Sequence, residues 1–263
     1  MDKGGKSRMD KKILIATPVH QDEDIFREFL FSLNHLIIPY GYSADVFFIL
    51  HNCPNLKVYL QEGQYTEINN DVVLRQEGAN GRKQWTQENY SIVAEMRTSL
   101  LKKAREEKYD YLFMVDSDVL LHPKILKMLI TDNKDIVSSL SWTKPNLSSN
   151  LEIPCGMDEG WGVYKDVSFA LNPALYAIGW TGRCTLISSR IFNNPNISYY
   201  QIPGVDNTGS EDYAFCLRCY CNFPDLEICM ETRFPSRHLY NKKEYYRWMI
   251  EKAKYFKEKK REI

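Results

Sequence analysis

Two carboxylates separated by one residue are the strongest chemical feature of the sequence. Asp116 and Asp118 flank Ser117, directly after an apolar run over 111–115 that has the length and composition of a buried strand. In open α/β sheets, ligands bind at the carboxyl ends of the strands. Two acids at that edge place hard oxygen donors within reach of one divalent cation, which could in turn hold a diphosphate. The alternative is a strand that simply ends in polar residues, with Asp118 starting the next turn.

A second acidic pair follows much later in the chain. Glu211 and Asp212 come directly after Ser210, which predicts a helix cap with two acids in the first turn. Acids are common at this position because of the helix dipole alone, so the pair has a structural explanation as well as a catalytic one.

One arginine and two glycines could support these acids. Arg97 falls on or beside the apolar face of a helix predicted over 88–107. A buried cation needs a partner, and the carboxylates after the next strand are the nearest candidates in chain order, unless Arg97 snorkels from the edge of the face. Gly179 and Gly182 precede a strand-like run, where glycine would let the backbone approach a ligand closely.

The elements that position these residues alternate between strand and helix. This order predicts an α/β fold with a Rossmann-like, mostly parallel central sheet and helices on both faces. The first strand is expected to break at Thr17-Pro18. A long irregular segment over 143–172, with Trp142, Trp161 and Tyr164 in or beside it, is typical of a binding loop or lid. Strands are predicted over 13–16, 46–50, 72–74, 111–115, 135–140 and 226–230, and helices over 25–37, 88–107 and 242–263.

Composition and charge exclude several classes of protein. Lys+Arg and Asp+Glu number 34 each in 263 residues, so there is no general electrostatic case for nucleic acid as a partner. No apolar run approaches the roughly 18–20 residues that cross a bilayer. The charged start of the chain does not resemble a signal peptide, so residues 1–11 are predicted to be a disordered tail and the protein to be cytoplasmic. The lysine-rich helix over 242–263 could lie weakly on an anionic membrane, although docking against the domain is favoured.

The seven cysteines are expected to be reduced, because the count is odd and no export signal precedes them. A structural zinc site is the weaker alternative to buried free thiols for one cluster, since paired CxxC motifs are absent. That cluster consists of Cys216, Cys219, Cys221 and Cys229.

Taken in chain order, these features resemble the GT-A fold glycosyltransferases, in particular the family-2-like, nucleotide-sugar-dependent transferases. Members carry an Asp-x-Asp motif at a strand end, a glycine-rich loop, an acidic pair that opens a helix and a histidine towards the C-terminus. The matching positions here are 116–118, 179–182, 211–212 and His238, and the resemblance covers the chain from Lys12 to about Tyr240.

The resemblance implies transfer of a hexose from a UDP- or GDP-sugar to a hydroxyl of a glycan, lipid-linked or protein acceptor. It implies Mn²⁺ or Mg²⁺ on the diphosphate, with Asp116, Asp118 and His238 as the metal ligands. Asp212, or as second choice Glu211, would be the catalytic base. The residues implied in binding the nucleotide sugar are Thr17, Pro18, Arg97, Asp116, Ser117, Asp118, Gly179 and Gly182.

The same resemblance implies one catalytic domain over 12–241. Its halves would be a nucleotide-sugar-binding half over 12–142 and a smaller acceptor-binding half over 143–241. The sequence departs from the commonest family pattern at two strand ends, which read ThrProValHis and HisAsnCysPro where Pro-x-x-Asn and an acidic residue are usual. The nucleobase therefore remains open between uridine and guanosine.

Three other functions share part of this pattern. A haloacid-dehalogenase-like phosphatase also places Asp-x-Asp after a strand, but near the start of the chain and not in its middle. A sugar-nucleotide pyrophosphorylase would need a glycine- and arginine-rich loop after the first strand, which is absent. A non-catalytic carbohydrate-binding domain on the same fold is the third alternative, because fold alone does not determine function.

Overall fold

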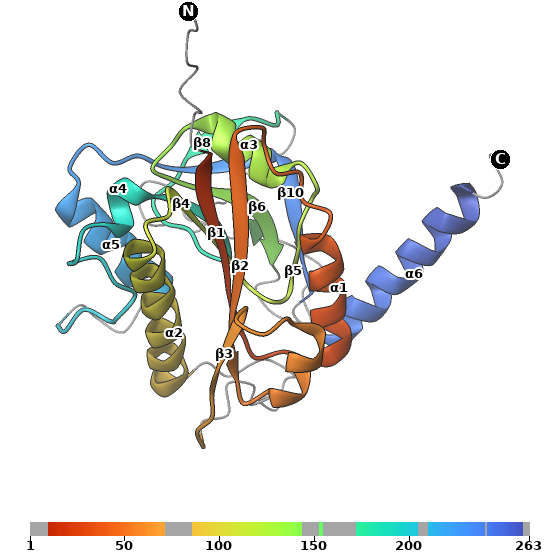
Figure 1. The fold of residues 1–263 in the computed structure, drawn as a ribbon. Helices are drawn as coiled ribbons and strands as arrows, with labels where there is room; N and C mark the ends of the chain where they lie inside the picture. The colour runs from red at the N-terminus through yellow and green to blue at the C-terminus, as the bar shows by residue number, and fades with distance from the viewer. Residues whose placement is uncertain are drawn as a thin grey trace, which may run out of the picture.

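The computed structural model describes residues 10–71, 86–143, 153–154, 172–204, 210–239 and 241–259, which form one layered α/β unit (Figure 1). The strands are β1 (Lys11–Val19), β2 (Tyr42–His51), β3 (Tyr65–Ile68), β4 (Tyr111–Val115), β5 (Val119–Leu120), β6 (Ile136–Thr143), β7 (Ile153–Pro154), β8 (Leu175–Ala177), β9 (Cys184–Ser188) and β10 (Ile228–His238). The helices are α1 (Glu23–Leu33), the 3₁₀ turn η1 (Pro54–Tyr59), α2 (Gln87–Glu106), α3 (Ile125–Asp132), α4 (Ser189–Phe192), α5 (Glu211–Asn222) and α6 (Lys242–Lys259).

The described strands form one sheet in the order β3-β2-β1-β4-β9-β6-β10-β5, with β7 added to β6 and β8 to β10. Strands β3, β2, β1 and β4 are parallel to one another, and β6 is parallel to β10. Strand β9 is antiparallel to both of its neighbours, β4 and β6. The start of β9 therefore lies at the edge where β4, β6 and β10 end. The mostly parallel α/β sheet predicted from the sequence is confirmed.

Helices cover both faces of the sheet, as expected. Alternate residues of β1 point to opposite faces, so Leu14 packs in the core beneath α2 and α5, whereas Ile13 packs in the core beneath α1 and α3. In Figure 1, α2, α4 and α5 lie on one side of the sheet and α1 and α3 on the other. The central strand β4 is buried along its whole length, which explains its uninterrupted apolar sequence.

The predicted break of the first strand at Thr17-Pro18 is wrong, because β1 continues to Val19. Its pairing with β4 ends at Ala16, whereas its pairing with β2 continues through Pro18 to Val19. At Pro18, β1 therefore has a hydrogen-bonded neighbour, β2, on one side only. The missing N–H of proline removes no hydrogen bond on the unpaired side.

Two short strands were not expected from the sequence. Strand β3 adds to β2, and β5 pairs with the end of β10. The strand predicted over 72–74, residues Trp161 and Tyr164, and most of the irregular segment over 143–172 lie outside the described residues. The predicted helix over 25–37 is α1, which ends earlier, at Leu33.

Helix α6 docks against α1 at one place and projects from the domain beyond it (Figure 1). The Glu28 carboxylate of α1 accepts hydrogen bonds from Trp248 Nε1 and Lys252 Nζ, both at 2.9 Å. Within the described ranges, no helix combines the length and apolar character of a membrane span.

The cysteine cluster contains free thiols. Cys216, Cys219 and Cys229 are buried and Cys221 is exposed. The described part of the chain contains no grouping of three or more cysteine, histidine or acidic side chains suited to a metal.

Candidate active site at the carboxyl edge of the sheet

The Asp-x-Asp stretch turns sharply away from the end of β4. Asp116 N–H donates to the Arg183 carbonyl at 2.7 Å, and Val119 N–H donates back to the Asp116 carbonyl at 3.1 Å. Ser117 and Asp118 are buried, whereas the Asp116 side chain is about one-quarter exposed. The two carboxylates after β4 therefore lie in different environments, with Asp118 buried and Asp116 partly exposed.

Arg97 joins the two acidic stretches into one cluster. Its Nη2 donates to Asp116 Oδ1 at 2.6 Å, its Nη1 donates to Asp212 Oδ1, and the same Nη1 lies 3.6 Å from Glu211 Oε1. Arg97 is almost completely buried. The pairing with the carboxylates after the next strand, expected from the sequence, is thus present. One guanidinium serves three carboxylates from two distant segments.

Helix caps begin the two helices, α2 and α5, that carry Arg97 and the acidic pair. The Thr86 side chain accepts from Asn89 N–H and the Asn89 side chain from Thr86 N–H, a capping box that starts α2 two turns or more before Arg97. The Ser210 side chain accepts from Tyr213 N–H and starts α5 with Glu211 and Asp212 in its first turn, as predicted. Both acids consequently point from a helix start towards α2.

Burial makes the acidic pair difficult to ionise. Burial raises the pKa of Asp212 to about 8; Arg97 opposes the rise, and the neighbouring Glu211 and Asp116 charges add to it. Burial also raises the pKa of Glu211 against the attraction of Arg97. The pKa of Arg97 is raised in spite of its burial, because Asp212, Asp116 and Glu211 surround it. A cluster with one cation and three acids retains a proton near neutral pH.

Two buried polar atoms in the cluster have no hydrogen-bond partner among the described residues. They are Glu211 Oε2 and Arg97 Nε. Buried polar groups are nearly always satisfied by protein or by ordered water. These two atoms therefore mark a place where water or a polar ligand group fits.

Sequence reasoning missed the aromatic support of Arg97. The guanidinium carbon lies 5.5 Å from the centre of the Tyr199 ring, which is buried and stacks on Phe215 at 4.3 Å between centroids. Tyr199 lies in a stretch without a helix or strand pattern, so no local periodicity marks it.

Gly182 packs directly against the acidic cluster. A β-carbon at this position would lie 2.5 Å from the Asp212 carboxyl carbon, closer than such atoms approach in proteins. The absence of a side chain at position 182 is therefore what admits the Asp212 carboxylate.

Asp118 and His238 form a second group at the same edge. His238 ends β10, and pairing of Val119 with His238 across β5 and β10 brings the histidine beside the Asp-x-Asp turn. The Leu239 N–H donates to the Asp118 carbonyl at 2.7 Å, and His238 Nε2 lies 3.3 Å from Asp118 Oδ2. The short strand β5, absent from the sequence prediction, is the element that sets this distance.

The chemistry of this pair fits a divalent cation. A carboxylate oxygen and an imidazole nitrogen this close together can bind one ion, and Mn²⁺ accepts both donor types while Mg²⁺ prefers oxygen. Asp116 is engaged by Arg97, and no group of three acidic, histidine or cysteine donors occurs within the described residues. The described protein atoms thus offer two ligands, and a three-ligand set with Asp116 stays a prediction.

The ends of β1 and β2 carry a polar group that the sequence did not single out. His20 Nδ1 donates to the His51 carbonyl at 2.8 Å, and His51 Nε2 lies 3.0 Å from Asn70 Oδ1. Thr17 and Pro18 are buried just before this group, and the Thr17 hydroxyl has no hydrogen-bond partner among the described residues. The predicted nucleobase region therefore contains two imidazoles.

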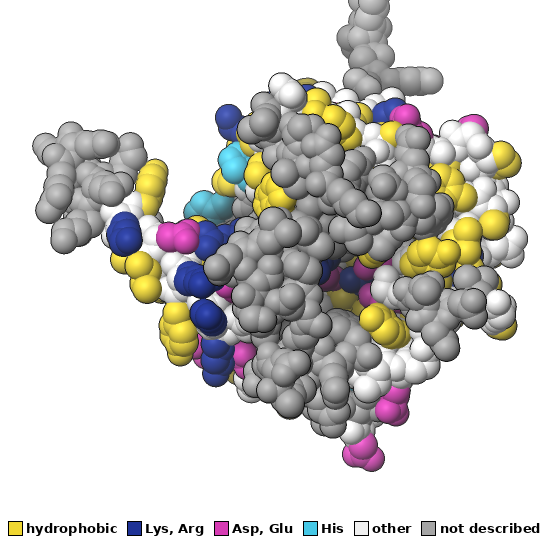
Figure 2. All heavy atoms as spheres, turned by 180° about the vertical axis from the view of Figure 1, so that it is seen from behind, with side chains coloured by type: hydrophobic (Ala, Val, Ile, Leu, Met, Phe, Trp, Pro, Cys, Tyr) yellow, Lys and Arg dark blue, Asp and Glu magenta, His cyan; other side chains and the backbone are white. Residues whose placement is uncertain are grey.

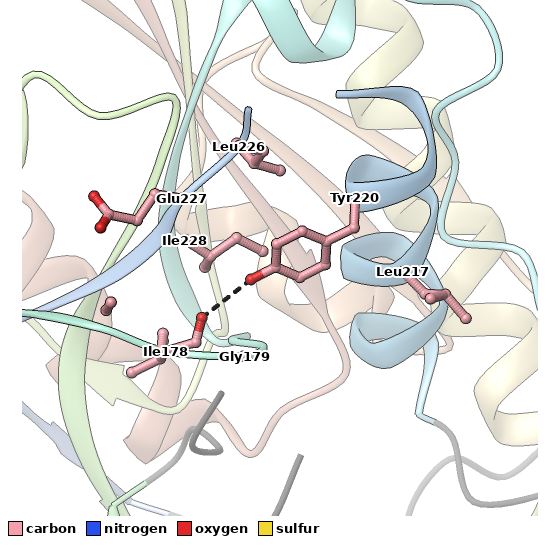
Figure 3. A pocket seen from close by; sticks show the side chains of 8 residues that line it. Ile178, Gly179, Leu217, Tyr220, Leu226, Glu227 and Ile228 are labelled. Carbon is pink, nitrogen blue, oxygen red and sulfur yellow. Dashed lines mark hydrogen bonds between the residues drawn. The ribbon is translucent and has the colours of Figure 1, made fainter. Parts of the chain in front are cut away.

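Gly179 lines a pocket of about 470 Å³ between α5, the end of β8 and the start of β10 (Figure 3), and no residue of the acidic cluster lines this pocket. Tyr220 Oη donates to the Ile178 carbonyl across it at 3.1 Å. The lining is mostly apolar, with Leu217, Leu226 and Ile228 among its side chains. The predicted role of Gly179 in donor binding stays a prediction.

A second pocket, of about 380 Å³, adjoins the candidate metal ligand His238. Trp142 and Arg237 line it together with Glu244 and Glu251 of α6. Trp142, which lies beside the segment expected to form a binding loop or lid, therefore borders the candidate site.

Comparison with known families gives one match that spans most of the site. The model of "Glycosyltransferase family 25, N-terminal domain" matches residues 54–234, more than half of the chain. The matched span includes Arg97, 116–118, 179–182 and 211–212. Thr17, Pro18 and His238 lie outside it.

Curated relatives are similar to parts of the chain. Procollagen galactosyltransferase 1-A of Xenopus laevis is 25% identical over 165 residues, 60% of this chain and 26% of the relative. Procollagen galactosyltransferase 1 of Danio rerio is 37% identical over 90 residues, 34% of this chain and 14% of the relative. The matched segments thus span about a quarter or less of these relatives.

Two solved structures are distantly similar in fold to this chain. A197 from STIV has a TM-score of 0.45 at 13% identity, covering 88% of this chain and 86% of that one. Residues 1–349 of S. aureus TarS have a TM-score of 0.49 at 12% identity, covering 86% of this chain and 60% of that one. Similarity at this level carries no argument about function.

Proposed function

The chain belongs to glycosyltransferase family 25, through the N-terminal domain of that family, and we propose that it transfers a sugar from a nucleoside-diphosphate donor to an acceptor hydroxyl. The observation that supports this most is the Arg97 cluster. It joins Asp116 of the Asp-x-Asp stretch to Glu211 and Asp212 at the carboxyl edge of the sheet. That is the edge where ligands bind in GT-A-type and other open α/β folds.

The donor diphosphate is proposed to lie at Asp118 and His238, which would hold Mn²⁺ or Mg²⁺ through one carboxylate oxygen and one imidazole nitrogen. When bound, the cation offsets the negative charge that develops on the departing diphosphate. Ser117 and Asp116, in the same turn, are proposed to contact the donor, and Thr17 and Pro18 to border its nucleobase.

Asp212 is proposed as the catalytic base and Glu211 as the second candidate. As the bond between the sugar and the acceptor oxygen forms, the hydroxyl proton would pass to the carboxylate while the bond to the diphosphate breaks. Burial and neighbouring acids give Asp212 a pKa of about 8, close to working pH, which suits a proton acceptor. Arg97 would hold the carboxylate in place.

Galactose is the donor sugar that we propose to test first, since the relatives' printed names are those of procollagen galactosyltransferases. A protein hydroxyl is the matching acceptor. The predicted cytoplasmic location, the acceptor-side subdomain and the division at residue 142 stay predictions.

Association with a membrane surface through α6 also stays a proposal. Tyr246 and Ile250 are 58% and 56% exposed, and Lys242, Lys243 and Lys254 are exposed beside them. Figure 2 shows basic and hydrophobic side chains together along the projecting helix. An apolar stripe flanked by lysines is typical of helices that lie on anionic bilayers.

A thermal-shift panel tests the main proposal. UDP- and GDP-sugars, each with and without Mn²⁺, are added to the wild type, to Asp118→Ala and to the control Asp225→Ala, an exposed carboxylate paired with Arg190. Donor binding raises the unfolding midpoint by mass action. We expect a metal-dependent rise in the wild type and in Asp225→Ala that Asp118→Ala loses.

The alternatives give different results in the same panel. A carbohydrate-binding domain without transferase activity would respond to free glycans without metal. Membership of a glycosyltransferase family already argues against the phosphatase alternative. If no nucleotide sugar shifts the midpoint under any condition, the proposed function is wrong.

A further inference from the structure

Arg183 occupies an unusual position between the two halves of the candidate site. It lies between Gly182 and the start of β9 and has a φ of +70°, in the left-handed region that residues with side chains seldom adopt. Its carbonyl accepts the Asp116 N–H at 2.7 Å. The backbone of Arg183 is thereby fixed to the Asp-x-Asp turn, and strained backbone of this kind gathers at functional sites.

The Arg183 side chain determines which nitrogen of His238 carries the proton. Arg183 Nη1 lies 2.7 Å from His238 Nδ1. A guanidinium can only donate, so Nδ1 must be the acceptor and carry no proton. In the neutral ring the proton is then on Nε2, which faces Asp118 Oδ2 at 3.3 Å. Arg183, His238 and Asp118 form a chain of donors and acceptors, and in the neutral ring only a proton on Nε2 satisfies both contacts of His238.

This assignment conflicts with metal binding by His238. A histidine that ligates a cation through Nε2 offers the lone pair of that nitrogen and carries its proton on Nδ1. With Nδ1 protonated, Arg183 faces a donor and loses its acceptor. The contact between Arg183 and His238 and a metal bond at Nε2 therefore exclude each other.

A displaced Arg183 would still have anionic groups within reach. Its charge already acts on the Asp212 carboxylate, where it opposes the rise in pKa that burial causes. Guanidinium groups bind phosphate oxygens through paired hydrogen bonds. A diphosphate placed at Asp118 and His238 would lie next to Arg183, whose side chain contacts His238 and whose backbone carbonyl accepts the Asp116 N–H.

We propose that Arg183 alternates between two partners: His238 in the ligand-free protein and the donor diphosphate in the loaded protein. Arrival of the diphosphate removes Arg183 from Nδ1. The ring proton can then move through solvent from Nε2 to Nδ1, which leaves the Nε2 lone pair for the cation. This inference rests on the proposed function, because it takes the diphosphate as the ligand of that site. It makes Arg183 a residue that couples cation binding to diphosphate binding.

The two ligands are tested separately, with Arg183→Met as the main variant. Binding of Mn²⁺ alone is followed from the electron paramagnetic resonance signal of the free ion, and binding of UDP and GDP by calorimetry in EDTA. Without Arg183, Mn²⁺ should bind about tenfold more tightly, since a repelling cation and a competitor for His238 are gone. The nucleoside diphosphates should bind about tenfold more weakly, since a charge-assisted contact is lost.

Changes in opposite directions support the proposal, because a variant with a merely damaged fold would weaken both. Equal affinities, or a change of both in one direction, overturn it. Arg190→Met, which removes an exposed arginine paired with Asp135 and Asp225, should change neither. Arg183→Gly repeats the test without strain at the positive φ, should Arg183→Met not fold.

A measurement without nucleotide separates this inference from the proposed function. Nitrogen-15 chemical shifts of the histidine rings, with His238 assigned through His238→Gln, should give the tautomer with the proton on Nε2 in the wild type and another state in Arg183→Met. A proton on Nδ1 in the wild type overturns the inference whatever the protein binds. If the tautomer is as expected but the wild type binds neither UDP nor GDP, the diphosphate half of the inference fails together with the proposed donor site.

Discussion

Gly182 and Asp212 approach so closely that a β-carbon on Gly182 would lie 2.5 Å from the Asp212 carboxyl carbon. The two residues come from different elements, the turn before β9 and the start of α5. Because Arg97 also pairs with the Asp212 carboxylate, a shift away from position 182 would disturb that ion pair.

Gly182→Ala should displace the Asp212 carboxylate and lower kcat by tenfold or more, since small misplacements of a catalytic group are costly. Metal-dependent binding of the nucleotide sugar should persist, because Asp118 and His238 are unchanged. Initial rates and thermal shifts on the same preparation check this. The control Gly63→Ala has open space around it but a φ of +84°, so it should lose some stability and retain the wild-type kcat. Full activity of Gly182→Ala would show that Asp212 is not placed as described.

The rate of transfer should rise with pH towards about 8. Burial raises the pKa of Asp212 to about 8, and a base must be ionised to accept a proton. Below that value, kcat/KM should increase about tenfold for each pH unit. Asp212→Asn should lose a factor of about 10² to 10⁴ together with this pH dependence. The assignment of the base to Asp212 fails if the rate is flat between pH 6 and 8, or if Glu211→Gln abolishes the slope instead.

Stability should change with pH in the opposite direction. Between the unfolded pKa of 3.8 and about 8, the folded protein keeps a proton on Asp212 that the unfolded chain releases. The folded state then binds more protons, so this group lowers the free energy of unfolding as pH rises through that window. Urea unfolding at pH 6 and pH 8 measures the effect. Asp212→Asn, which does not titrate, should show a smaller loss between the two values than the wild type.

Arg97→Met should destabilise the fold by about 3–5 kcal/mol at pH 8, because it leaves buried carboxylates without their cation. The loss should shrink at pH 5, where Asp212, whose pKa is raised to about 8, is protonated, and where the raised pKa of Glu211 reduces its charge relative to an ordinary glutamate. Denaturant unfolding at both values checks the prediction. Arg190→Met, at an exposed ion pair, should cost about 1 kcal/mol or less at either pH. An Arg97→Met loss that is the same at pH 5 and pH 8 would point to lost packing on Tyr199 and not to charge.

Replacing Tyr246 and Ile250 together by serine should weaken binding of the protein to vesicles containing anionic lipid. Both side chains are more than half exposed on α6, beside lysines that attract anionic headgroups. Co-sedimentation with anionic and with neutral vesicles measures the binding. Tyr40→Ser removes an exposed aromatic elsewhere and should change nothing. If the wild type does not sediment with anionic vesicles, the membrane proposal for α6 is wrong.

The sequence was sufficient to predict an element wherever the residue pattern within that element determines its structure. The strand Tyr111–Val115 is apolar throughout because both of its faces are covered, and it was predicted to the residue. The Ser210 cap and the helix that contains Arg97 follow from side chains within a few positions of each other. Pairing of Arg97 with the carboxylates after the next strand was one of two open alternatives, argued from the cost of burying a cation, and the other was a snorkelling side chain.

Features that depend on distant pairing could not be predicted from the sequence. Strand β5 has two residues and exists because β10 lies beside it. Pro18 continues a strand because β1 is paired on one side at that point. Arg183 follows a glycine in a stretch without periodicity, and only the meeting of β9 with the end of β4 gives it a place in the site.

The position of β10 determines when the sheet can close during synthesis of the chain. Strand β10 is the last strand of the described chain to leave the ribosome, yet it lies inside the sheet, between β6 and β5. Until it arrives, β6 presents an open hydrogen-bonding edge to solvent or to chaperones, and such edges invite aggregation. His238 is the final residue of this strand. A nascent or truncated chain that ends before it would thus lack both a closed sheet and the histidine beside Asp118, so acquisition of ligand binding would report that translation has passed this strand.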